Sequence, residues 1–409
     1  MDYDILIAGA GPAGLCFARA LAGTPLRLGI VEAQPEATLA DPAYDGREIA
    51  LTHHSARILR ELGLWDRFGP EEVSPLRDAC VLNGPGRAAL RIDHRDSRKD
   101  QLGYLISNHI IRRKAYEAVR GQEGLELRAA TRVSGVRTRP EHVEVRLAGA
   151  EVLTARLLVA ADSRFSESRR AVGIPASMRD FGKTMLVCRM EHEKPHEHVA
   201  VEWFGYGQTV ALLPLLGNAC SVVLTLPDQE IRELLALEPG EFATGIEERV
   251  QGRLGKMRLA SDRHPYPLVG VYPARLVAHR FAAIGDAAVG MHPVTAHGFN
   301  FGLRGLDTLA GEIRAALAAG RDFAAPAPLA RYERTHQGAT RPLYLATQAI
   351  VTLFTNDAAP VRMVRDLLLR TVDRVAPFKK LIANSLTEEH EADRARRRAA
   401  PGAAPHGAP

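Results

Sequence analysis

A glycine-rich segment near the N-terminus has the spacing of a phosphate-binding loop. It contains Gly9, Gly11, Ala13 and Gly14 and follows a short apolar run that predicts a buried strand. Gly9 permits a tight turn, Gly11 lets the backbone approach a pyrophosphate, and Gly14 allows a helix to pack closely on the strand. Residues 12–22 have the pattern of that helix, whose first N–H groups attract phosphate oxygens. The segment therefore predicts a dinucleotide site.

An acidic residue stands at the expected distance beyond this loop. Glu32 ends a second predicted strand over residues 26–31 and lies eighteen residues after Gly14. Its carboxylate can accept hydrogen bonds from both hydroxyl groups of an adenosine ribose, whereas it would repel a 2′-phosphate. The loop and the carboxylate together are more specific than the glycines alone.

Two aspartates end later predicted strands. Asp162 follows the apolar run 157–161, and Asp286 follows Gly285 after the run 281–284. A carboxylate at the C-terminal edge of a parallel strand can bind a hydroxyl group of a cofactor. The alternative is that each aspartate only caps a turn or a helix, and for Asp162 taken alone capping is favoured.

The segment after the second aspartate combines polar residues with a predicted helix start. Pro293 and His297 precede Gly298, Phe299 and Asn300, where the helical pattern begins. The positive end of the helix dipole would point at an electron-rich group of a ligand. The alternative is an ordinary capped helix.

The elements that must hold these residues change character along the chain. A helix is predicted over residues 48–62 and several strands over 125–158. Strand-like runs dominate residues 176–274, interrupted by one predicted helix over about 228–254. Beyond residue 328 the pattern is mostly helical to about residue 386.

These patterns predict an α/β fold with a Rossmann-like nucleotide-binding domain, an inserted antiparallel-sheet domain for the substrate and a helical C-terminal region. The predicted boundaries are 1–70, 101–175 and 276–328 for the discontinuous nucleotide-binding domain, 71–100 and 176–275 for the substrate domain, 329–387 for the helical region and 388–409 for a disordered tail.

The composition excludes several classes of protein. The chain has 409 residues, of which 46% are hydrophobic and 25% charged, as in a globular protein of two or more domains. The net charge of +5 includes no basic stripe, so no nucleic-acid partner is expected. No apolar run approaches the ~20 residues of a membrane span, and no signal-peptide pattern opens the chain. We expect a cytoplasmic protein, at most peripheral at the inner face of the membrane.

No metal site is expected. The histidine-rich segment 191–198 alternates in charge and contains Pro195, as solvated loops do, whereas zinc needs converging ligands. The cysteines are widely spaced and predict buried, reduced thiols: Cys16, Cys80, Cys188 and Cys220.

The three motifs, in this order, resemble those of the group A flavoprotein aromatic hydroxylases, the para-hydroxybenzoate hydroxylase superfamily. The form of the third motif and the C-terminal region are most similar to the ubiquinone-biosynthesis hydroxylases. The resemblance extends from residue 3 to about residue 386. Further matching segments are DGREIAL at 45–51, LLPL at 212–215, YER at 332–334 and LFTN at 353–356.

The resemblance implies FAD as the cofactor. It implies that Arg47 lies near the pyrophosphate and the flavin, that Asn108 is on the helix that touches the ribityl chain and the pyrophosphate, and that Pro293 lies beside the flavin ring. Residues 298–300 would face the N1–C2=O edge of that ring. The implied cofactor-binding residues are Gly9, Gly11, Ala13, Gly14, Glu32, Arg47, Asn108, Asp162, Gly285, Asp286, Pro293, Gly298, Phe299 and Asn300.

The sequence departs from the family pattern at three places. Ser163 replaces a usual glycine after Asp162, which leaves the handling of NAD(P)H open. Gly305 replaces a usual aspartate. His297 replaces a usual glutamine near the flavin, and it either stabilises reduced flavin as an imidazolium or only replaces a hydrogen-bonding group, the interpretation that we favour.

The activity that the resemblance implies is hydroxylation of an aromatic ring. NAD(P)H would reduce FAD, and O2 would form a flavin C4a-hydroperoxide that hydroxylates a polyprenyl phenol of ubiquinone synthesis. The inserted sheet would bind this hydrophobic substrate through Trp203, Leu212, Leu213 and Pro214. The alternatives are hydroxylation of another aromatic or polyketide, a reductase without oxygen transfer, and a flavoprotein scaffold of low activity in a quinone-synthesis complex.

Overall fold

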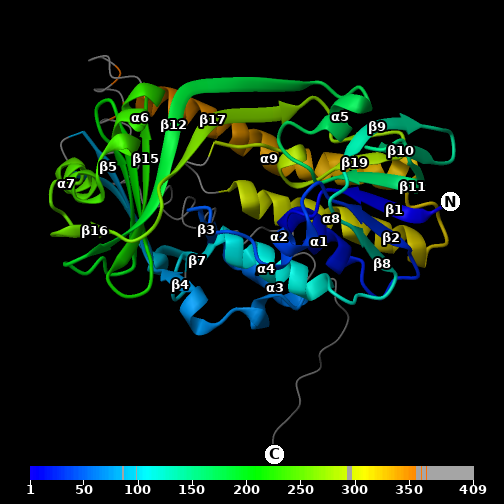
Figure 1. Ribbon diagram of the computed structural model, residues 1–409, viewed down its shortest axis with the longest axis horizontal. Helices are drawn as coiled ribbons and strands as arrows, with labels where there is room; N and C mark the ends of the chain where they lie inside the picture. Colours follow the sequence, from blue (N-terminus) through cyan, green and yellow to red (C-terminus); the bar gives the residue numbers. More distant parts are fainter. Residues whose placement is uncertain (85–86, 98, 293–296, 356–360, 362–364, 366–409) are drawn as a thin grey trace, which may run out of the picture.

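The structure is a computed structural model that describes the chain except for residues 85–86, 98, 293–296, 356–360, 362–364 and 366–409. The predicted tail and most of the predicted C-terminal region beyond residue 355 lie outside the described residues. Figure 1 shows two large sheets at opposite ends of the molecule, with the long strand β12 and the long helix α9 running between them.

The first large sheet carries the predicted dinucleotide loop. Its strands have the order β18-β19-β11-β1-β2-β8, and β10 and β9 extend it from β11. The central strands are parallel, with Ile7 of β1 opposite Val159 of β11 and Ile30 of β2. β1 and β2 are buried on both faces, which explains their continuous apolar sequences. The bounds are β1 (Tyr3–Ala8), β2 (Leu28–Val31), β8 (Leu125–Arg128), β9 (Val133–Thr138), β10 (Val143–Leu147), β11 (Val152–Ala160), β18 (Val277–Ala278) and β19 (Phe281–Ala283).

Helices α1, α4 and α8 pack together beside this sheet, and α9 packs on α8. Pro12 begins α1, where its missing N–H group costs no hydrogen bond. Further helices of the chain have the bounds α1 (Pro12–Ala20), α2 (Glu36–Ala40), α3 (His53–Glu61), α4 (Asn108–Val119), α5 (Glu167–Ala171), α8 (Gly298–Ala318) and α9 (Pro326–Thr355), and short 3-10 turns lie at η1 (Trp65–Arg67), η2 (Pro70–Glu72), η3 (His94–Ser97) and η4 (Gly285–Ala287).

The second large sheet has the order β16-β12-β15-β14-β13-β5-β6, with β17 also paired to β12. Antiparallel pairing dominates, as predicted, and β13 and β5 pair in parallel. Helices α6 and α7 cover one face of this sheet (Figure 1). The bounds are β5 (Asp78–Asn83), β6 (Arg87–Ile92), β12 (Ala176–His192), β13 (Val199–Phe204), β14 (Thr209–Pro214), β15 (Ala219–Leu226), β16 (Met257–Leu259), β17 (His264–Pro273), α6 (Asp228–Ala236) and α7 (Pro239–Arg249).

A small third sheet lies between the two large ones. Its order is β3-β7-β4, and its bounds are β3 (Glu48–Leu51), β4 (Ser74–Leu76) and β7 (Gly103–Ser107).

Two expected helices were placed wrongly. The helix predicted over 48–62 starts only at His53, because residues 48–51 pair with β7 and Thr52 caps α3 by accepting a hydrogen bond from the Ser55 N–H group. The helix predicted over 228–254 is two helices, α6 and α7, because Pro239 starts a new helix and disfavours the helical conformation in the residue before it.

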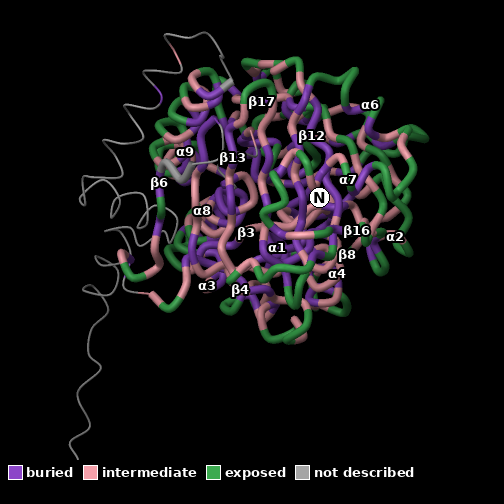
Figure 2. The backbone as a smooth tube through the Cα atoms, turned by 90° about the vertical axis from the view of Figure 1, so that its left-hand side faces the viewer, coloured by how far each residue is buried: buried purple, intermediate pink, exposed green. Residues whose placement is uncertain are grey.

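Buried residues gather in the interior of the molecule, and exposed residues lie mainly on the outer loops (Figure 2). The four cysteines form no disulfide among the described residues. In that same part of the chain, no helix combines the length and the apolar character that crossing a membrane requires.

Candidate cofactor and substrate site

The glycine loop is shaped by close backbone contacts. Gly9 has a φ of +107°, and a Cβ atom there would lie 2.6 Å from the carbonyl oxygen of Ala161. A Cβ on Gly14 would lie 2.0 Å from the carbonyl oxygen of Gly9. A Cβ on Gly11 would meet nothing within 4 Å. Gly9 and Gly14 therefore serve packing, whereas Gly11 borders open space into which a phosphate group fits.

Glu32 lies directly beside this loop. Its carboxylate accepts hydrogen bonds from the N–H groups of Ala10, at 2.7 Å, and Gln34, at 2.8 Å. A cavity of about 280 Å³ opens here and is bordered by Gly9, Glu32 and Asp162. Its remaining lining includes residues 131–133, from the β8–β9 connection and the start of β9, which no motif of the sequence indicated. Residues 163 and 165, which follow Asp162 in the predicted motif, also line it.

Asp162 makes local capping contacts at the end of β11. Its carboxylate accepts hydrogen bonds from the N–H groups of Ser163, at 3.0 Å, and Ser168, at 3.3 Å. The buried Arg169 of the same motif donates to the carbonyl oxygen of Ala287 at 2.9 Å. The motif thus ties α5 to the turn that carries Asp286.

The turn after β19 brings three predicted segments together. Gly285 has a φ of +58°, and a Cβ there would lie 2.7 Å from the Cβ of Ala13 at the start of α1. A Cβ on Gly302 of α8 would lie 3.5 Å from the Cα of Gly285. Asp286 is half-exposed and pairs with Arg164 at 3.2 Å. The carboxylate of Asp286 therefore lies near the dinucleotide loop and the first turns of α8.

Arg47 and Asn108 share one carboxylate. Asp45 pairs with the Arg47 guanidinium at 2.6 Å and accepts a hydrogen bond from the Asn108 amide at 2.7 Å. Burial would raise the pKa of Asp45, but the hydrogen bonds and charge of Arg47 outweigh it and lower that pKa. Tyr266 of β17 donates to the Asp45 carbonyl oxygen at 2.6 Å. The structure thus brings Arg47 and Asn108 together, at the edge of the second large sheet.

Helix α8 starts at the predicted position, but one side chain of its first turn forms its hydrogen bonds within the protein. Asn300 is buried, accepts a hydrogen bond from the Thr52 N–H group at 3.1 Å and donates to the Ala50 carbonyl oxygen at 2.8 Å. His297 precedes the helix, is only 6% exposed and lies 5.8 Å from the Phe301 ring. The first N–H groups of α8, including those of Gly298 and Phe299, have no acceptor within the helix. Their contact with the flavin remains a prediction. Pro293 lies outside the described residues.

A buried ion pair that the sequence analysis missed joins the second sheet to this region. Glu48 of β3 is almost completely buried and pairs with Arg189 of β12 at 2.7 Å. Ser107 donates to Glu48 at 2.8 Å and also bonds Arg189. Burial is the largest influence on Glu48 and raises its pKa. No local pattern could have revealed this pair, because its charges are 141 positions apart.

The side of the second sheet that carries Arg189 is called the inner face. Strand register defines the inner face, because paired residues of neighbouring strands point to the same side of a sheet. Val187 and Arg189 of β12 lie on it, and so do the residues paired with them across β15, β14, β13 and β5. The inner face consists of Met185, Val187 and Arg189 of β12, Ser221, Val223 and Thr225 of β15, Thr209, Ala211 and Leu213 of β14, Ala200, Glu202 and Phe204 of β13, and Ala79, Val81 and Asn83 of β5. Most of these residues are only partly buried, although the face points toward the cofactor region.

Three of the four residues predicted to contact the substrate lie on the side of the second sheet opposite the inner face. Trp203 and Leu212 lie on the opposite side of the sheet, in a sealed hydrophobic cluster with Phe242 and Ile246 of α7. The indole N–H of Trp203 donates to a main-chain oxygen at 2.9 Å. Pro214 shares the side of Leu212 by alternation. Leu213 lies on the inner face, so its contact with the substrate stays a prediction.

Comparison with known proteins decides the family. A family model described as an FAD binding domain matches residues 2–340. This chain belongs to that family. The ubiquinone hydroxylase UbiM of Neisseria meningitidis is 47% identical over 391 residues, which cover 95% of this chain and 85% of that protein. The ubiquinone hydroxylase UbiL of Rhodospirillum rubrum is 36% identical over 379 residues, 92% of this chain and 88% of that protein.

A solved structure shows the same fold. The p-nitrophenol 4-monooxygenase PnpA of Pseudomonas putida DLL-E4 matches with a TM-score of 0.76 at 17% identity, covering 95% of this chain and 98% of that chain. The resemblance to group A FAD-dependent hydroxylases, and to their ubiquinone-biosynthesis branch, is therefore confirmed. The predicted α/β class with its FAD-binding domain is confirmed as well.

The geometry of this FAD-binding chain fits the cofactor. The open side of Gly11 leaves room for a pyrophosphate, and the cavity beside Glu32 leaves room for a nucleoside. The individual cofactor contacts remain proposals.

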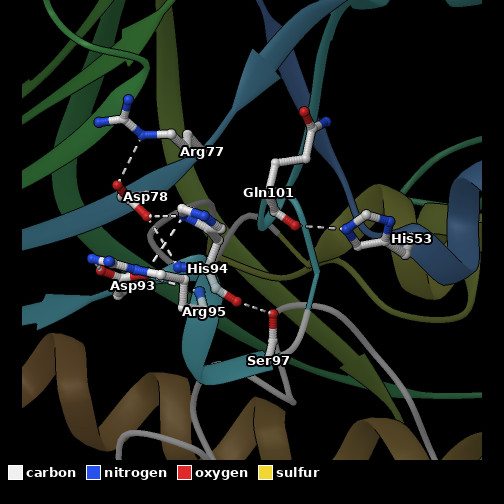
Figure 3. Close-up of polar contacts among 8 residues, drawn as sticks. All are labelled: His53, Arg77, Asp78, Asp93, His94, Arg95, Ser97 and Gln101. Atoms are coloured by element: carbon white, nitrogen blue, oxygen red, sulfur yellow. Dashed lines mark hydrogen bonds and ion pairs between the residues drawn. The ribbon is translucent and has the colours of Figure 1, made fainter.

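A polar cluster of the FAD-binding chain lies at the start of β5 in the second sheet (Figure 3). Asp78 accepts hydrogen bonds from Arg77 at 3.0 Å and from His94 at 2.7 Å, and Asp93 pairs with Arg95 at 2.6 Å. Asp78, Asp93 and His94 are close enough to hold a cation, but their charges are already balanced by arginines. We interpret the cluster as a structural link between β5 and η3.

Proposed function

We propose that this chain is an FAD-dependent monooxygenase that hydroxylates the aromatic ring of a polyprenylated ubiquinone precursor. The observation that carries the proposal is the 47% identity to the ubiquinone hydroxylase UbiM over 95% of the chain. Such an extended match includes both the cofactor region and the second sheet, so it supports a shared substrate class as well as a shared cofactor.

FAD, when bound, would supply the activation of O2, with NAD(P)H as the source of electrons. Gly11 and the first turn of α1 would hold the pyrophosphate, and Glu32 would bind the adenosine ribose. Asp286 would accept a hydrogen bond from the ribityl chain. The N-terminus of α8 would stabilise negative charge on the flavin ring.

The protein would bind the aromatic ring on the inner face. The apolar side chains there, such as Val81, Ala211 and Leu213, exclude water and suit a polyprenyl phenol. Arg189 is neutralised by Glu48, so it does not present a free charge to this face. The division into an FAD-binding domain, with segments 1–70, 101–175 and 276–328, and a substrate domain is part of the same proposal. So is a peripheral association with the membrane or with a quinone-synthesis complex.

Deletion of the gene in a quinone-producing host tests the proposal. We expect a polyprenylated precursor that lacks one ring hydroxyl group to accumulate, as identified by mass spectrometry, and the intact gene to restore ubiquinone. Normal ubiquinone with no accumulated intermediate would contradict the proposal.

A matched pair of variants in the same host links the activity to the cofactor site. Asp286→Ala should lose bound flavin, seen as loss of yellow absorbance after purification, and should fail to restore ubiquinone. Asp66→Ala, at an exposed position on η1, serves as the control and should do neither. Full flavin content in Asp286→Ala would contradict the role given to this carboxylate.

A further inference from the structure

One arginine connects a loop of the first large sheet with the second large sheet and with the turn that carries Asp286. Arg164 lies between β11 and α5, and its guanidinium makes two contacts. One Nη atom donates to the main-chain oxygen of Val269 in β17 at 3.0 Å. The other donates to the Asp286 carboxylate at 3.2 Å. The side chain of Arg164 therefore joins β17 to the turn η4.

The surroundings of Arg164 hold it in this place. Its carbonyl oxygen accepts a hydrogen bond at 3.2 Å from Arg169, which also donates to the Ala287 carbonyl oxygen at 2.9 Å. A Cβ on Gly290 would lie 2.9 Å from the Cβ of Arg164, so the absence of a side chain at Gly290 gives Arg164 its space. Gly290 is fixed in turn, because its N–H and C=O groups bond the main chain of Val271 at 2.9 and 2.8 Å.

The carboxylate of Asp286 depends on Arg164 for its orientation. The Asp286 side chain is 48% exposed, and Arg164 makes its only hydrogen bond or ion pair among the described residues. An exposed carboxylate without a partner samples several rotamers, and fixing one of them costs entropy. Arg164 bonds Oδ2 and leaves Oδ1 able to accept a hydrogen bond from a hydroxyl group.

We propose that Arg164 is a positioning residue for the cofactor, which fixes the Asp286 carboxylate so that its second oxygen accepts a hydrogen bond from the ribityl chain of FAD. The inference rests on the proposed contact between Asp286 and that chain. A carboxylate that is fixed before binding loses less entropy when FAD binds, so the affinity rises. The guanidinium also neutralises a charge that repels the anionic cofactor.

Arginine suits this task better than lysine does. Its planar guanidinium offers several N–H groups in a fixed geometry, so it can bond Val269 and Asp286 at the same time. The bond to Val269 anchors the guanidinium on β17, and the anchored group then holds the carboxylate. Two other roles would use the same contacts: Arg164 could only link β17 to η4, or it could contact FAD directly.

A double-mutant cycle on FAD affinity tests the proposal without turnover. The apoprotein is titrated with FAD, and the dissociation constant is measured from the quenching of flavin fluorescence. The four proteins are the wild type, Arg164→Gln, Asp286→Ala and the double variant. We expect Arg164→Gln to raise the dissociation constant about fivefold, the size of one ordered side chain. In the Asp286→Ala background the same substitution should change it by less than about twofold, because the group through which Arg164 acts is gone.

The cycle distinguishes the proposal from both other roles. A purely structural link would be lost in both backgrounds, and so would a direct contact with FAD. Each of these roles therefore predicts that Arg164→Gln weakens FAD binding equally with and without Asp286, and that result would overturn the proposal. An unchanged or tighter affinity in the single variant would overturn it as well. Titration in about 0.5 M salt screens the general attraction between an arginine and the anionic cofactor.

Two further variants complete the test. Arg164→Lys keeps the positive charge but not the planar fork, so it should recover only part of the affinity that Arg164→Gln loses. If Arg164→Gln does not fold, as judged by circular dichroism of the apoprotein, the cycle is measured with Arg164→Lys and the same coupling to Asp286 is expected. Arg137→Gln, at an exposed position of β9, is the matched control and should bind FAD as the wild type does.

The outcome is separable from that of the proposed function. If Asp286→Ala weakens FAD binding but Arg164→Gln does not, the cofactor contact stands and the role of Arg164 fails. If Asp286→Ala binds FAD as the wild type does, the contact and the role of Arg164 fail together. Neither result decides the substrate, which the gene deletion tests independently.

Discussion

The cofactor region and the inner face of the second sheet are built by different means. At the cofactor region, main-chain atoms approach so closely that side chains are excluded: a Cβ on Gly14 would lie 2.0 Å from the carbonyl oxygen of Gly9. On the inner face, side chains form the surface, and strand alternation decides which of them take part. Trp203 and Glu202 are neighbours in sequence, yet one is sealed against α7 and the other faces the interior between the sheets. A close contact at a glycine can be predicted from one short segment of sequence. The side of a sheet on which a residue lies can be predicted only when the register of several strands is known.

The largest expected effect distinguishes Gly14, which serves packing, from Gly11, which borders the space for the ligand. Gly14→Ala forces the loop and α1 apart and should lower the free energy of unfolding by about 3 kcal/mol, with loss of bound FAD. Gly11→Ala is the matched control, because its Cβ meets nothing within 4 Å. Its apoprotein should melt as the wild type does while its FAD affinity falls. Thermal unfolding and flavin titration measure the two effects, and equal loss of stability in both variants would refute the distinction.

The next effect distinguishes the two faces of the second sheet. Trp203→Ala should lower the free energy of unfolding by about 3 kcal/mol or more, because it leaves a cavity in the cluster with α7 and removes the bond to the Gly84 oxygen. Leu213→Ala, on the partly buried inner face, should cost less stability and weaken binding of the probe 4-heptylphenol to the FAD-loaded protein. Urea unfolding and probe binding compare the pair. A weakened probe affinity in Trp203→Ala alone would reverse the assignment of the faces.

A smaller effect concerns pH and the helix behind the cofactor region. His336 of α9 packs on Gly305 of α8, where a Cβ would lie 2.8 Å from the imidazole ring. Burial, with a smaller contribution from Arg304, lowers the pKa of His336 to about 3. Since the unfolded chain takes up this proton at its ordinary pKa, stability should fall as the pH drops below about 6.5, by about 2 kcal/mol between pH 7 and 5.

Variants isolate this histidine. His336→Leu should remove most of that dependence on pH, whereas His279→Gln, at an exposed position, should keep it. Urea unfolding at a series of pH values provides the measurement. An unchanged slope in a folded His336→Leu protein would show that other groups cause the loss.

The same contrast explains how far the sequence predicted the molecule. The FAD-binding fold and the family followed from short motifs, because Gly9, Gly14 and Gly285 satisfy local backbone requirements that a sequence displays directly. The absence of an aspartate at Gly305 became understandable only with the structure, since the His336 ring occupies the space next to it.

The errors arose where distant segments decide the outcome. Residues 48–51 form a strand only because β7 is there to pair with them, and the Glu48–Arg189 pair joins positions that no local pattern connects. Trp203 and Leu212 were chosen for their apolar character, which a substrate face and a hydrophobic core share. Only strand register separates the two, and it also places Glu202 on the inner face.

The most direct test of the central claim is oxygen transfer by the purified protein. The FAD-loaded enzyme is supplied with a polyprenyl phenol, NADPH or NADH, and ¹⁸O2, and the products are analysed by mass spectrometry. We predict a product that carries one additional hydroxyl group on the ring, with its oxygen derived from ¹⁸O2. Oxidation of the nicotinamide that yields only hydrogen peroxide with every phenol supplied would contradict the account.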